Sequence, residues 1–396
     1  MGDDPGTTTG AVVELDRVTK RYGGPGTPAA VNELSLTVAA GAICVLVGPS
    51  GCGKTTTMKM INRLIEPTGG RITIDGEDIM RLPAVELRRR IGYVIQQVGL
   101  FPHLTVGDNV AVVPRLLRWR EPRIRERVEE LLDLIGLDAA SYAHRYPSQL
   151  SGGERQRVGV ARALAADPPL MLMDEPFGAV DPIQRDRLQN EFLRLQRRVR
   201  KTVVFVTHDV DEAIKMADRI AILQRGGVLA QYDTPDAILA HPASEFVERF
   251  VGADRGLKRL SLGRVRDLAL LEPVVVRAGE RRAEVRARLG GIDELSYALL
   301  VDGEDRPLGW IDEGDLAGDG AIDPGAATPG APTVEPETTL RDALSAMLGS
   351  SVQLGVVVDE RERVIGLVSV EAISDALRAP VRGADGVLHE VGGSPS

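Results

Sequence analysis

A glycine-rich segment at residues 48–55 has the residue types of a phosphate-binding loop. It reads Gly-Pro-Ser-Gly-Cys-Gly-Lys-Thr, which matches G-x-x-x-x-G-K-[ST], and it lies between an apolar run and a stretch of helical periodicity. Glycines let backbone N–H groups approach phosphate oxygens, the lysine can reach the β and γ phosphates, and the threonine hydroxyl can ligate Mg²⁺. An ordinary glycine-rich turn is the alternative. The residues expected to bind nucleotide here are Gly48, Ser50, Gly51, Cys52, Gly53, Lys54, Thr55 and Thr56.

Two adjacent carboxylates, Asp174 and Glu175, follow a second apolar run at residues 170–173. A strand-end carboxylate beside a phosphate loop can hold Mg²⁺ through water, and a second one can polarise the attacking water. Two acids at a strand tip could also be a solvated end, but the phosphate loop favours a shared site. The pattern therefore predicts Thr55 and Asp174 as metal ligands and Glu175 as the general base.

A third segment combines a serine with a glycine pair at the start of a helical pattern. Ser151, Gly152 and Gly153 precede an apolar-periodic stretch at residues 158–165. A hydroxyl and free N–H groups at a helix N-terminus can bind an anion, because the helix dipole is positive there. An ordinary helix cap is the alternative.

Together the three segments resemble the signature of the ATP-binding-cassette (ABC) family, whose motifs cover residues 14–250. The resemblance implies that Tyr22 stacks on adenine, that Gln96 senses Mg²⁺ and the membrane partner, that Asp181 is the D-loop acid and that His208 is the switch histidine. It thus assigns Glu175, His208 and Gln96 to catalysis, and adds Gln96 to the metal ligands. Taken alone, these residues would be ordinary loop or near-core positions, and only their order and spacing favour the site.

The family resemblance also implies an assembly. Two copies are expected to sandwich two ATP molecules, with Ser151 and Gly153 of one chain facing the γ-phosphate held by Lys54 of the other. Two helical patterns, at residues 107–119 and 122–135, fall in a helical subdomain at about 97–158 that is expected to contact a membrane permease. The expected partners are a second copy, the permease and, indirectly, a solute-binding protein, at the cytoplasmic face of the membrane.

The strings at residues 92–103, 181–184 and 203–209 look like the osmoprotectant branch of that family, whose ATPases drive uptake of glycine betaine, choline and related quaternary amines. An importer ATPase for a different solute is the alternative. A soluble cassette ATPase of DNA repair or translation is a second alternative. The DNA-repair type has a long coiled coil between the phosphate loop and the serine–glycine segment. Lys54 and Ser151 are 97 residues apart here with no sustained heptad, and translation types carry two cassettes per chain.

The elements that must position these residues alternate in the first 250 positions. Short apolar runs at 42–47, 170–173 and 203–207 are separated by helical patterns such as 55–65 and 183–199. That alternation predicts an α/β fold with a parallel sheet.

Composition limits the function classes. With 48 Lys and Arg against 57 Asp and Glu, the net charge of −9 argues against a chain that coats nucleic acid. No apolar run approaches the ~20 residues of a membrane helix, and the N-terminus does not look like a signal peptide. Two cysteines imply no disulfide framework, so we expect a cytoplasmic chain.

A charge boundary near residue 255 divides the chain, because residues 255–396 carry 16 basic against 24 acidic residues. The expected domains are an ABC nucleotide-binding domain at 11–252 and two small α+β domains at 257–317 and 328–380. The two small domains follow from an internal repeat, in which Asp302 and Gly309 recur as Asp359 and Gly366 at the same spacing.

The repeat resembles a tandem pair of CBS modules, so the predicted fold is an α/β P-loop ABC ATPase followed by an α+β CBS pair. A barrel of short strands is the alternative, although residues 338–348 and 370–377 read as helices. Neither copy completes the nucleotide-binding pattern of CBS modules, because the first has Asp312 in place of the hydroxyl and the second has Ala372 in place of the acid. The sequence leaves three roles open for the tail, residues 255–396. These are nucleotide binding, ionic-strength sensing through opposed charge patches, and simple dimerisation.

Overall fold

A computed structural model describes residues 10–24, 26–95, 99–178, 180–290, 297–323, 325, 327–328, 330–350, 352–378, 381–382 and 388–389. The chain divides into two compact units, Met1–Gly252 and Ala253–Ser396. Within the described residues, no helix has the length and apolar content needed to cross a membrane.

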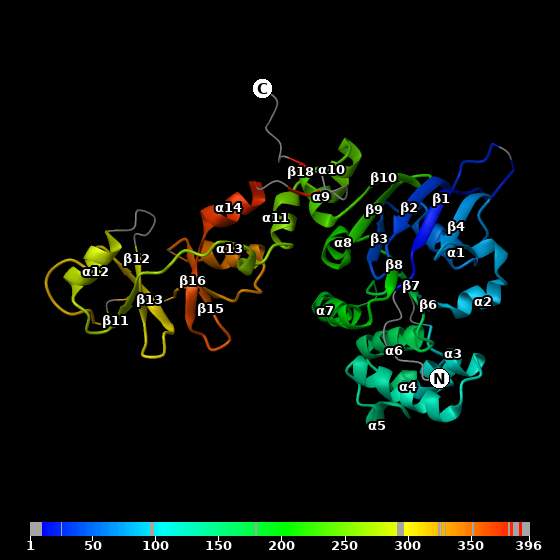
Figure 1. Cartoon of the computed structure of the whole chain (residues 1–396), viewed down its shortest axis with the longest axis horizontal. Coiled ribbons are helices and arrows are strands. Elements are labelled where there is room, and N and C mark those ends of the chain that lie inside the picture. Colours follow the sequence, from blue (N-terminus) through cyan, green and yellow to red (C-terminus); the bar gives the residue numbers. More distant parts are fainter. Residues whose placement is uncertain are drawn as a thin grey trace. The chain divides into compact units, whose positions relative to one another are not determined.

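The first unit is built on a six-stranded sheet in the order β10-β9-β3-β8-β7-β6 (Figure 1). All neighbouring strands run parallel except β10, which pairs antiparallel with β9. The three apolar runs of the sequence form its central strands, which are buried as such runs require in a parallel sheet. The predicted α/β fold is therefore confirmed. The strands are β3 (Ile43–Val47), β6 (Ile91–Val94), β7 (Leu170–Asp174), β8 (Thr202–Val206), β9 (Arg219–Gln224) and β10 (Val228–Asp233).

Helices connect these strands. The longest, α7 (Pro182–Val199), buries Leu188, Phe192 and Leu195, which recur every three or four residues on one face. The other helices around the sheet are α1 (Lys54–Ile61), α2 (Ala84–Arg89), α8 (Val210–Met216), α9 (Pro235–Ala240) and α10 (Glu245–Val251), with a 3₁₀ turn at Ile79–Arg81.

A four-stranded antiparallel sheet, in the order β2-β1-β4-β5, completes the strands of this unit. Residues of β2 alternate between buried and exposed positions, because one face of the sheet packs on the core. The strands are β1 (Val13–Lys20), β2 (Val31–Val38), β4 (Gly69–Ile74) and β5 (Glu77–Asp78).

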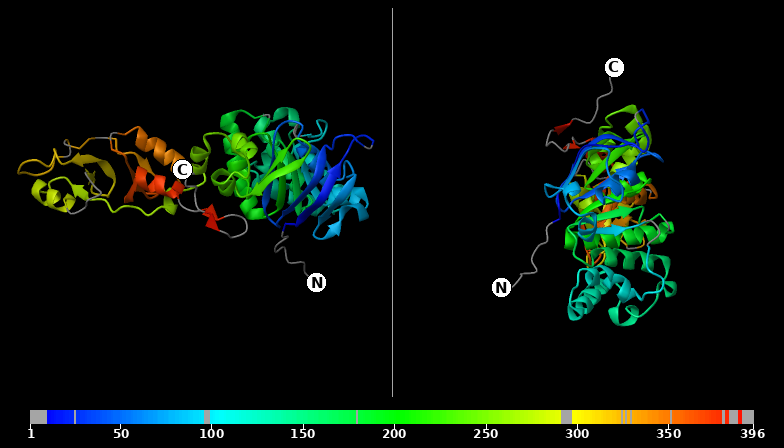
Figure 2. Two further views of the ribbon diagram at one scale, coloured as in Figure 1. Left: turned by 90° about the horizontal axis from the view of Figure 1, so that it is seen from above. Right: turned by 90° about the vertical axis from the view of Figure 1, so that its right-hand side faces the viewer.

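A helical layer lies at the other end of the unit from β1 and β2 (Figure 2, right). It contains α3 (Val106–Leu116), α4 (Glu121–Leu134), α5 (Ala139–Tyr142) and α6 (Gly152–Leu164), with a 3₁₀ turn at Pro147–Gln149. Helices occupy both stretches where the sequence predicts them. The first ends before residue 119, because Arg118 has a left-handed backbone with φ 57° that an α-helix cannot continue.

The second unit contains two three-stranded sheets of the same topology, β11-β12-β13 and β14-β15-β16. In each sheet the first two strands are parallel and the last two antiparallel, which agrees with the predicted tandem α+β pair and not with a barrel. The strands are β11 (Val275–Arg277), β12 (Tyr297–Val301), β13 (Pro307–Asp312), β14 (Thr333–Val334), β15 (Leu354–Val358), β16 (Val364–Ser369), β17 (Val381–Arg382) and β18 (Leu388–His389). The helices are α11 (Arg255–Leu260), α12 (Arg282–Leu289), α13 (Leu340–Leu348) and α14 (Val370–Arg378), with a 3₁₀ turn at Val265–Asp267.

The repeated aspartates make the same turn in each copy. Asp302 Oδ1 accepts from the backbone N–H groups of residues 304 and 306, at 2.8 and 2.9 Å. Asp359 Oδ1 accepts from residues 361 and 363 at the same two distances. Each aspartate therefore shapes a β-hairpin, which explains why the repeat begins with this residue type.

Two isolated β-bridges link the three-stranded sheets of the second unit to segments outside them. Leu271, which precedes β11, bridges to Leu367 in β16, and Thr328, which precedes β14, bridges to Trp310 in β13. Gly309 permits this approach, because a Cβ there would lie 2.6 Å from the Thr328 carbonyl oxygen. Each three-stranded sheet thus has a backbone bridge to the segment that precedes the other sheet.

Two of the arginines that cluster at the start of the first copy hold backbone groups of the second unit. The cluster consists of Arg277, Arg281, Arg282, Arg286 and Arg288. Arg282 donates to the Ala317 carbonyl at 3.1 Å, and Arg286 donates to the carbonyls of Leu316 and Gly318. Two further members, Arg277 and Arg288, pair with Asp305 and Glu280. These four charges are already engaged inside the tail.

Candidate nucleotide site

The loop between β3 and α1 requires glycine for two separate reasons. Gly48, Gly51 and Gly53 all have positive φ, at 150°, 75° and 101°. A Cβ on Gly48 would lie 2.3 Å from the Leu223 carbonyl oxygen, and one on Gly53 would lie 2.5 Å from that of Ala30. The loop is therefore held close to its neighbours in a conformation that side chains would forbid.

Lys54, the first residue of α1, lies within this loop with 8% of its surface exposed. Its ammonium donates to the carbonyl of Gly48 at 2.7 Å and to that of Pro49 at 3.2 Å. A buried cation needs such partners, because desolvation is costly. The loop thus holds the ammonium among its own backbone groups, where an incoming phosphate would meet a positive charge.

Thr55 and Asp174 meet across 119 positions of sequence. The Thr55 hydroxyl donates to Asp174 Oδ1 at 3.4 Å, from the first turn of α1 to the last residue of β7. Burial, and next the charge of Glu175, raise the pKa of the Asp174 carboxyl above its usual range. A hydroxyl and a half-buried carboxylate side by side form an oxygen donor set that fits a hard divalent cation such as Mg²⁺.

Glu175 and His208 also lie side by side. Each follows one of two neighbouring parallel strands, β7 and β8, and the Glu175 N–H donates to the Val206 carbonyl at 2.9 Å. His208 Nδ1 lies 3.2 Å from Glu175 Oε1. Glu175 has a left-handed backbone, with φ 43°, a conformation that is uncommon outside glycine and clusters at functional sites.

Glu154 fixes the geometry of Ser151, although the sequence alone does not single it out as a site residue. The Ser151 hydroxyl accepts from the Glu154 N–H at 3.3 Å, and a Glu154 carboxylate oxygen accepts from the Ser151 N–H at 2.7 Å. The other carboxylate oxygen accepts from the Tyr142 hydroxyl at 2.7 Å. These hydrogen bonds, Tyr142's first, lower the pKa of Glu154 to about 2. A serine followed by an acid three residues later is a capping-box pattern that could have revealed this pair.

Arg185 connects two predicted site residues. Asp181 caps α7 by accepting from the Gln184 N–H at 3.1 Å, and Arg185 one turn later donates to the Val180 carbonyl at 3.2 Å. The same guanidinium lies 3.6 Å from Asp209, the residue after His208. Arg185 therefore connects the Asp181 turn to the His208 turn. No sequence motif indicates this contact.

The remaining predicted residues have simpler placements. Gln96 lies outside the described residues. The Tyr22 side chain is 64% exposed after β1, with the Lys20 ammonium 5.2 Å from its ring centroid. Cys52 is buried in the phosphate loop, its sulfur 3.7 Å from the Lys54 ammonium. Ser50 belongs to the same loop, Thr56 to the first turn of α1, and Gly152 and Gly153 to the first turn of α6.

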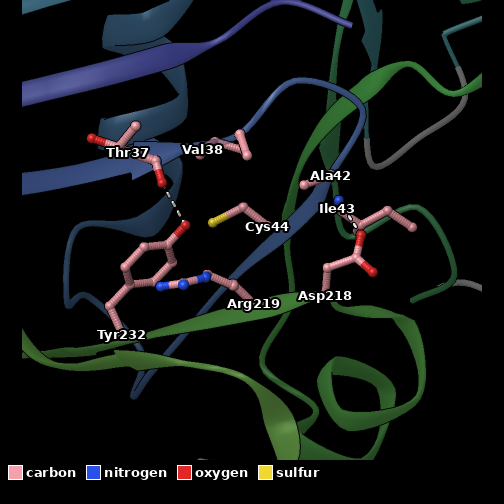
Figure 3. Close-up of a pocket in the computed structure, with 9 residues that line it drawn as sticks. Thr37, Val38, Ala42, Ile43, Cys44, Asp218, Arg219 and Tyr232 are labelled. Carbon is pink, nitrogen blue, oxygen red and sulfur yellow. Dashed lines mark hydrogen bonds between the residues drawn. The ribbon is translucent and has the colours of Figure 1, made fainter. Parts of the chain in front are cut away.

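A separate pocket of about 520 Å³ lies at the opposite end of the central strands (Figure 3). It is lined by Ile43 and Cys44 at the start of β3 and by Arg219 at the start of β9. Ligands of parallel α/β sheets bind at the carboxyl ends of the strands, which excludes this pocket as the nucleotide site. Burial raises the pKa of the Cys44 thiol to about 12, so the thiol is protonated and unreactive.

Comparison with known families agrees with the geometry. Residues 31–178 match the ABC transporter family, and residues 325–379 match the CBS domain. The ATP-binding cassette MJ0796, solved as a dimer in a post-hydrolysis state with ADP and Pi, is 36% identical and covers 56% of this chain and 98% of its own, with a TM-score of 0.50.

Two curated proteins are similar over most of the chain. The osmoprotectant import ATP-binding protein OsmV of Salmonella typhimurium is 45% identical, over 92% of this chain and 96% of its own. The glycine betaine/carnitine/choline transport ATP-binding protein OpuCA of Bacillus subtilis is 46% identical over the same shares of the two chains. Both similarities extend through the tail as well as the first unit.

Proposed function

Since the chain belongs to the ABC transporter family, we propose that it is the ATP-hydrolysing subunit of an importer for an osmoprotectant such as glycine betaine, choline or another quaternary amine. The similarity to OsmV and OpuCA supports this substrate class over an unrelated solute. It also supports an importer subunit over a soluble cassette ATPase.

One observation carries the proposed chemistry. The pairs Thr55–Asp174 and Glu175–His208 lie at the carboxyl ends of three strands that are adjacent in the sheet, in the order β3-β8-β7. Thr55 follows β3, His208 follows β8, and Asp174 and Glu175 end and follow β7. Parallel α/β sheets bind their ligands at this edge. A phosphate-binding lysine, a candidate metal-binding pair and a carboxylate–histidine pair therefore converge on one site.

In the proposed mechanism, the loop of residues 48–53 and the N-terminus of α1 bind the ATP phosphates, and Lys54 neutralises their charge. Thr55 and Asp174, with Gln96, would hold Mg²⁺, which when bound offsets negative charge on the phosphate oxygens. Tyr22 is exposed and so available to stack on the adenine ring.

Glu175 accepts the proton of the attacking water as general base, and we propose that His208 orients it. The 3.2 Å contact between the two side chains supports this role, because a base needs a fixed direction toward the proton it removes. Water attack on the γ-phosphorus breaks its bond to the bridging oxygen, releasing ADP and phosphate.

We further propose that two copies form the working site. Ser151, Gly152 and Gly153 at the start of α6 would bind the γ-phosphate held by the partner's phosphate loop, with Asp181 at the same interface. The dimeric form of MJ0796 supports this arrangement. A permease would dock on the helical layer and hold the chain at the cytoplasmic membrane face, with a solute-binding protein supplying the amine.

Reconstitution in proteoliposomes with a permease and a solute-binding protein that co-purify with this chain tests the proposal. We expect ATP hydrolysis in proteoliposomes to rise when glycine betaine or choline is added, and glycine to have no effect because it lacks the quaternary ammonium. The variant Glu175→Gln serves as the inactive control. Equal stimulation by glycine, or none by any quaternary amine, would contradict the substrate class.

A further inference from the structure

A pocket of about 300 Å³ lies between α4, α6 and α7, and none of the predicted nucleotide-site residues lines it. We call it the α6–α7 pocket. Its walls are largely apolar. They come from α4 and α6 of the helical layer and from α7 and the segment before it, which follow β7 of the central sheet. They include Ile135, Val160, Phe177, Leu188 and Phe192, each 8% exposed or less. Small-molecule pockets of this size typically combine such walls with a few polar groups.

One residue that lines the α6–α7 pocket has a buried amide nitrogen without a partner in the described part of the chain. Gln156 is 3% exposed, and its Nε2 has no hydrogen-bond partner among the described residues. The Nε of Arg157, the next residue on α6, is also buried without one. Because a buried N–H group without an acceptor is destabilising, an acceptor that enters the pocket would relieve a cost already present in the fold.

The exposed rim of the pocket is positive. Glu191 is already engaged, because Arg157 and Arg187 each approach one of its carboxylate oxygens at 3.1 Å. The described ion pairs include no partner for Arg194 or Arg198, which line the pocket on α7. Asp133 contributes one opposing negative charge, so two uncommitted cations face a single acid.

From these observations we propose that the α6–α7 pocket binds a small organic anion, an apolar body bearing one carboxylate, and that its occupation regulates ATP turnover. The apolar body fits the walls, the Gln156 amide turns toward the cavity to donate to the carboxylate, and Arg194 and Arg198 attract the negative charge. A neutral apolar ligand would leave the buried amide unsatisfied.

The regulatory part rests on the proposed ATPase function, and two contacts support it. Helix α6 begins beside Ser151 and α7 begins beside Asp181, so both helices that form the pocket start at predicted nucleotide-site residues. Gly153 lies against Leu188, since a Cβ on it would be 3.7 Å from a Leu188 methyl carbon. A ligand that shifts α6 relative to α7 would therefore move the Ser151 turn.

Calorimetric titration of the full chain with 1-naphthaleneacetate tests the binding, and its neutral amide is the matched ligand control. We expect saturable binding of the carboxylate and at least about tenfold weaker binding of the amide, because a charge-assisted hydrogen bond is lost. Gln156→Met, which keeps the side-chain length without the amide, should weaken carboxylate binding about tenfold. The double variant Arg194→Gln/Arg198→Gln should also weaken it, whereas Arg197→Gln, which changes an exposed arginine outside the pocket, should not.

The outcomes separate the two parts of the proposal. No saturable carboxylate binding at millimolar concentration, or equal binding to wild type and both pocket variants, would overturn the site. The double variant changes only exposed side chains, so it keeps the test valid if Gln156→Met fails to fold. Binding that leaves the ATPase rate unchanged would overturn the regulatory part alone. An inactive ATPase with intact, variant-sensitive binding would instead count against the proposed function.

Discussion

Arg185 offers the sharpest test of how the site is held together. Its guanidinium donates to the Val180 carbonyl and lies 3.6 Å from Asp209, so it connects the turns that carry Asp181 and His208. The variant Arg185→Gln removes this connection between the two turns, so the position of one relative to the other is less well fixed. We expect kcat for ATP hydrolysis to fall while KM for ATP changes little, because Arg185 contacts neither the phosphate loop nor Tyr22.

The magnitude follows from the two contacts. A hydrogen bond from a charged donor contributes about 1.5–3 kcal/mol. The ion pair is about one third exposed on both sides, so solvent screening leaves it about 0.5 kcal/mol. If about 2 kcal/mol of this positioning is lost from the transition state, kcat falls about 30-fold, and partial compensation by water would reduce the loss to about fivefold.

Steady-state ATPase kinetics of the full chain measures this effect. Arg187→Gln is the matched control, because Arg187 is on the same helix, is largely exposed and pairs with Glu191 instead of a residue of the Asp181 or His208 turn. Arg185→Lys should recover part of the rate, since lysine keeps the charge but cannot form both contacts. An unchanged kcat in Arg185→Gln, or a loss equal to that of Arg187→Gln, would refute the positioning role.

Three further predictions concern other parts of the chain. Lys54→Ala should weaken nucleotide binding, whereas Ser151→Arg should leave binding intact and abolish turnover; normal turnover by Ser151→Arg would exclude the contact between two chains. Burial raises the pKa of Glu212 above its ordinary 4.5, so its contribution to stability is present at acid pH and lost as pH rises through the raised value. Chemical denaturation at a series of pH values should therefore show that Glu212→Gln gains stability relative to wild type as the pH rises through that value. A difference in unfolding free energy that does not change with pH would contradict the burial effect. Gly309→Ala should lower the unfolding free energy of the tail by about 1–3 kcal/mol because its Cβ meets the Thr328 carbonyl, whereas Gly303→Ala, which meets nothing, should be neutral; equal effects would refute the close approach.

The chemical groups of the site could be predicted because each belongs to a short segment. The loop around Lys54 and the strand end at Asp174 carry their own local signals of glycine, apolar run and helical period. The sequence could not show how these segments meet. The 3.4 Å contact of Thr55 with Asp174 joins elements 119 positions apart, which only the strand order determines.

The positioning residues were harder to predict for the same reason. Tyr142 reaches Glu154 from a different helix, and Arg185 reaches Asp209 from a different turn, so no spacing rule connects them. The repeat in the tail was visible in Asp302 and Asp359. The bridges between its two halves were not visible, because an isolated bridge such as that of Trp310 with Thr328 has no periodic pattern.

The most direct test of the central claim is the turnover and ATP affinity of Glu175→Gln. We expect ATP binding to be retained and hydrolysis to fall about 10²-fold or more, because the amide keeps the shape of the side chain but cannot accept the proton of water. ATP should then hold two copies together, which size-exclusion chromatography with and without ATP would show. Near-normal hydrolysis by this variant would contradict the assignment of Glu175 and with it the proposed site.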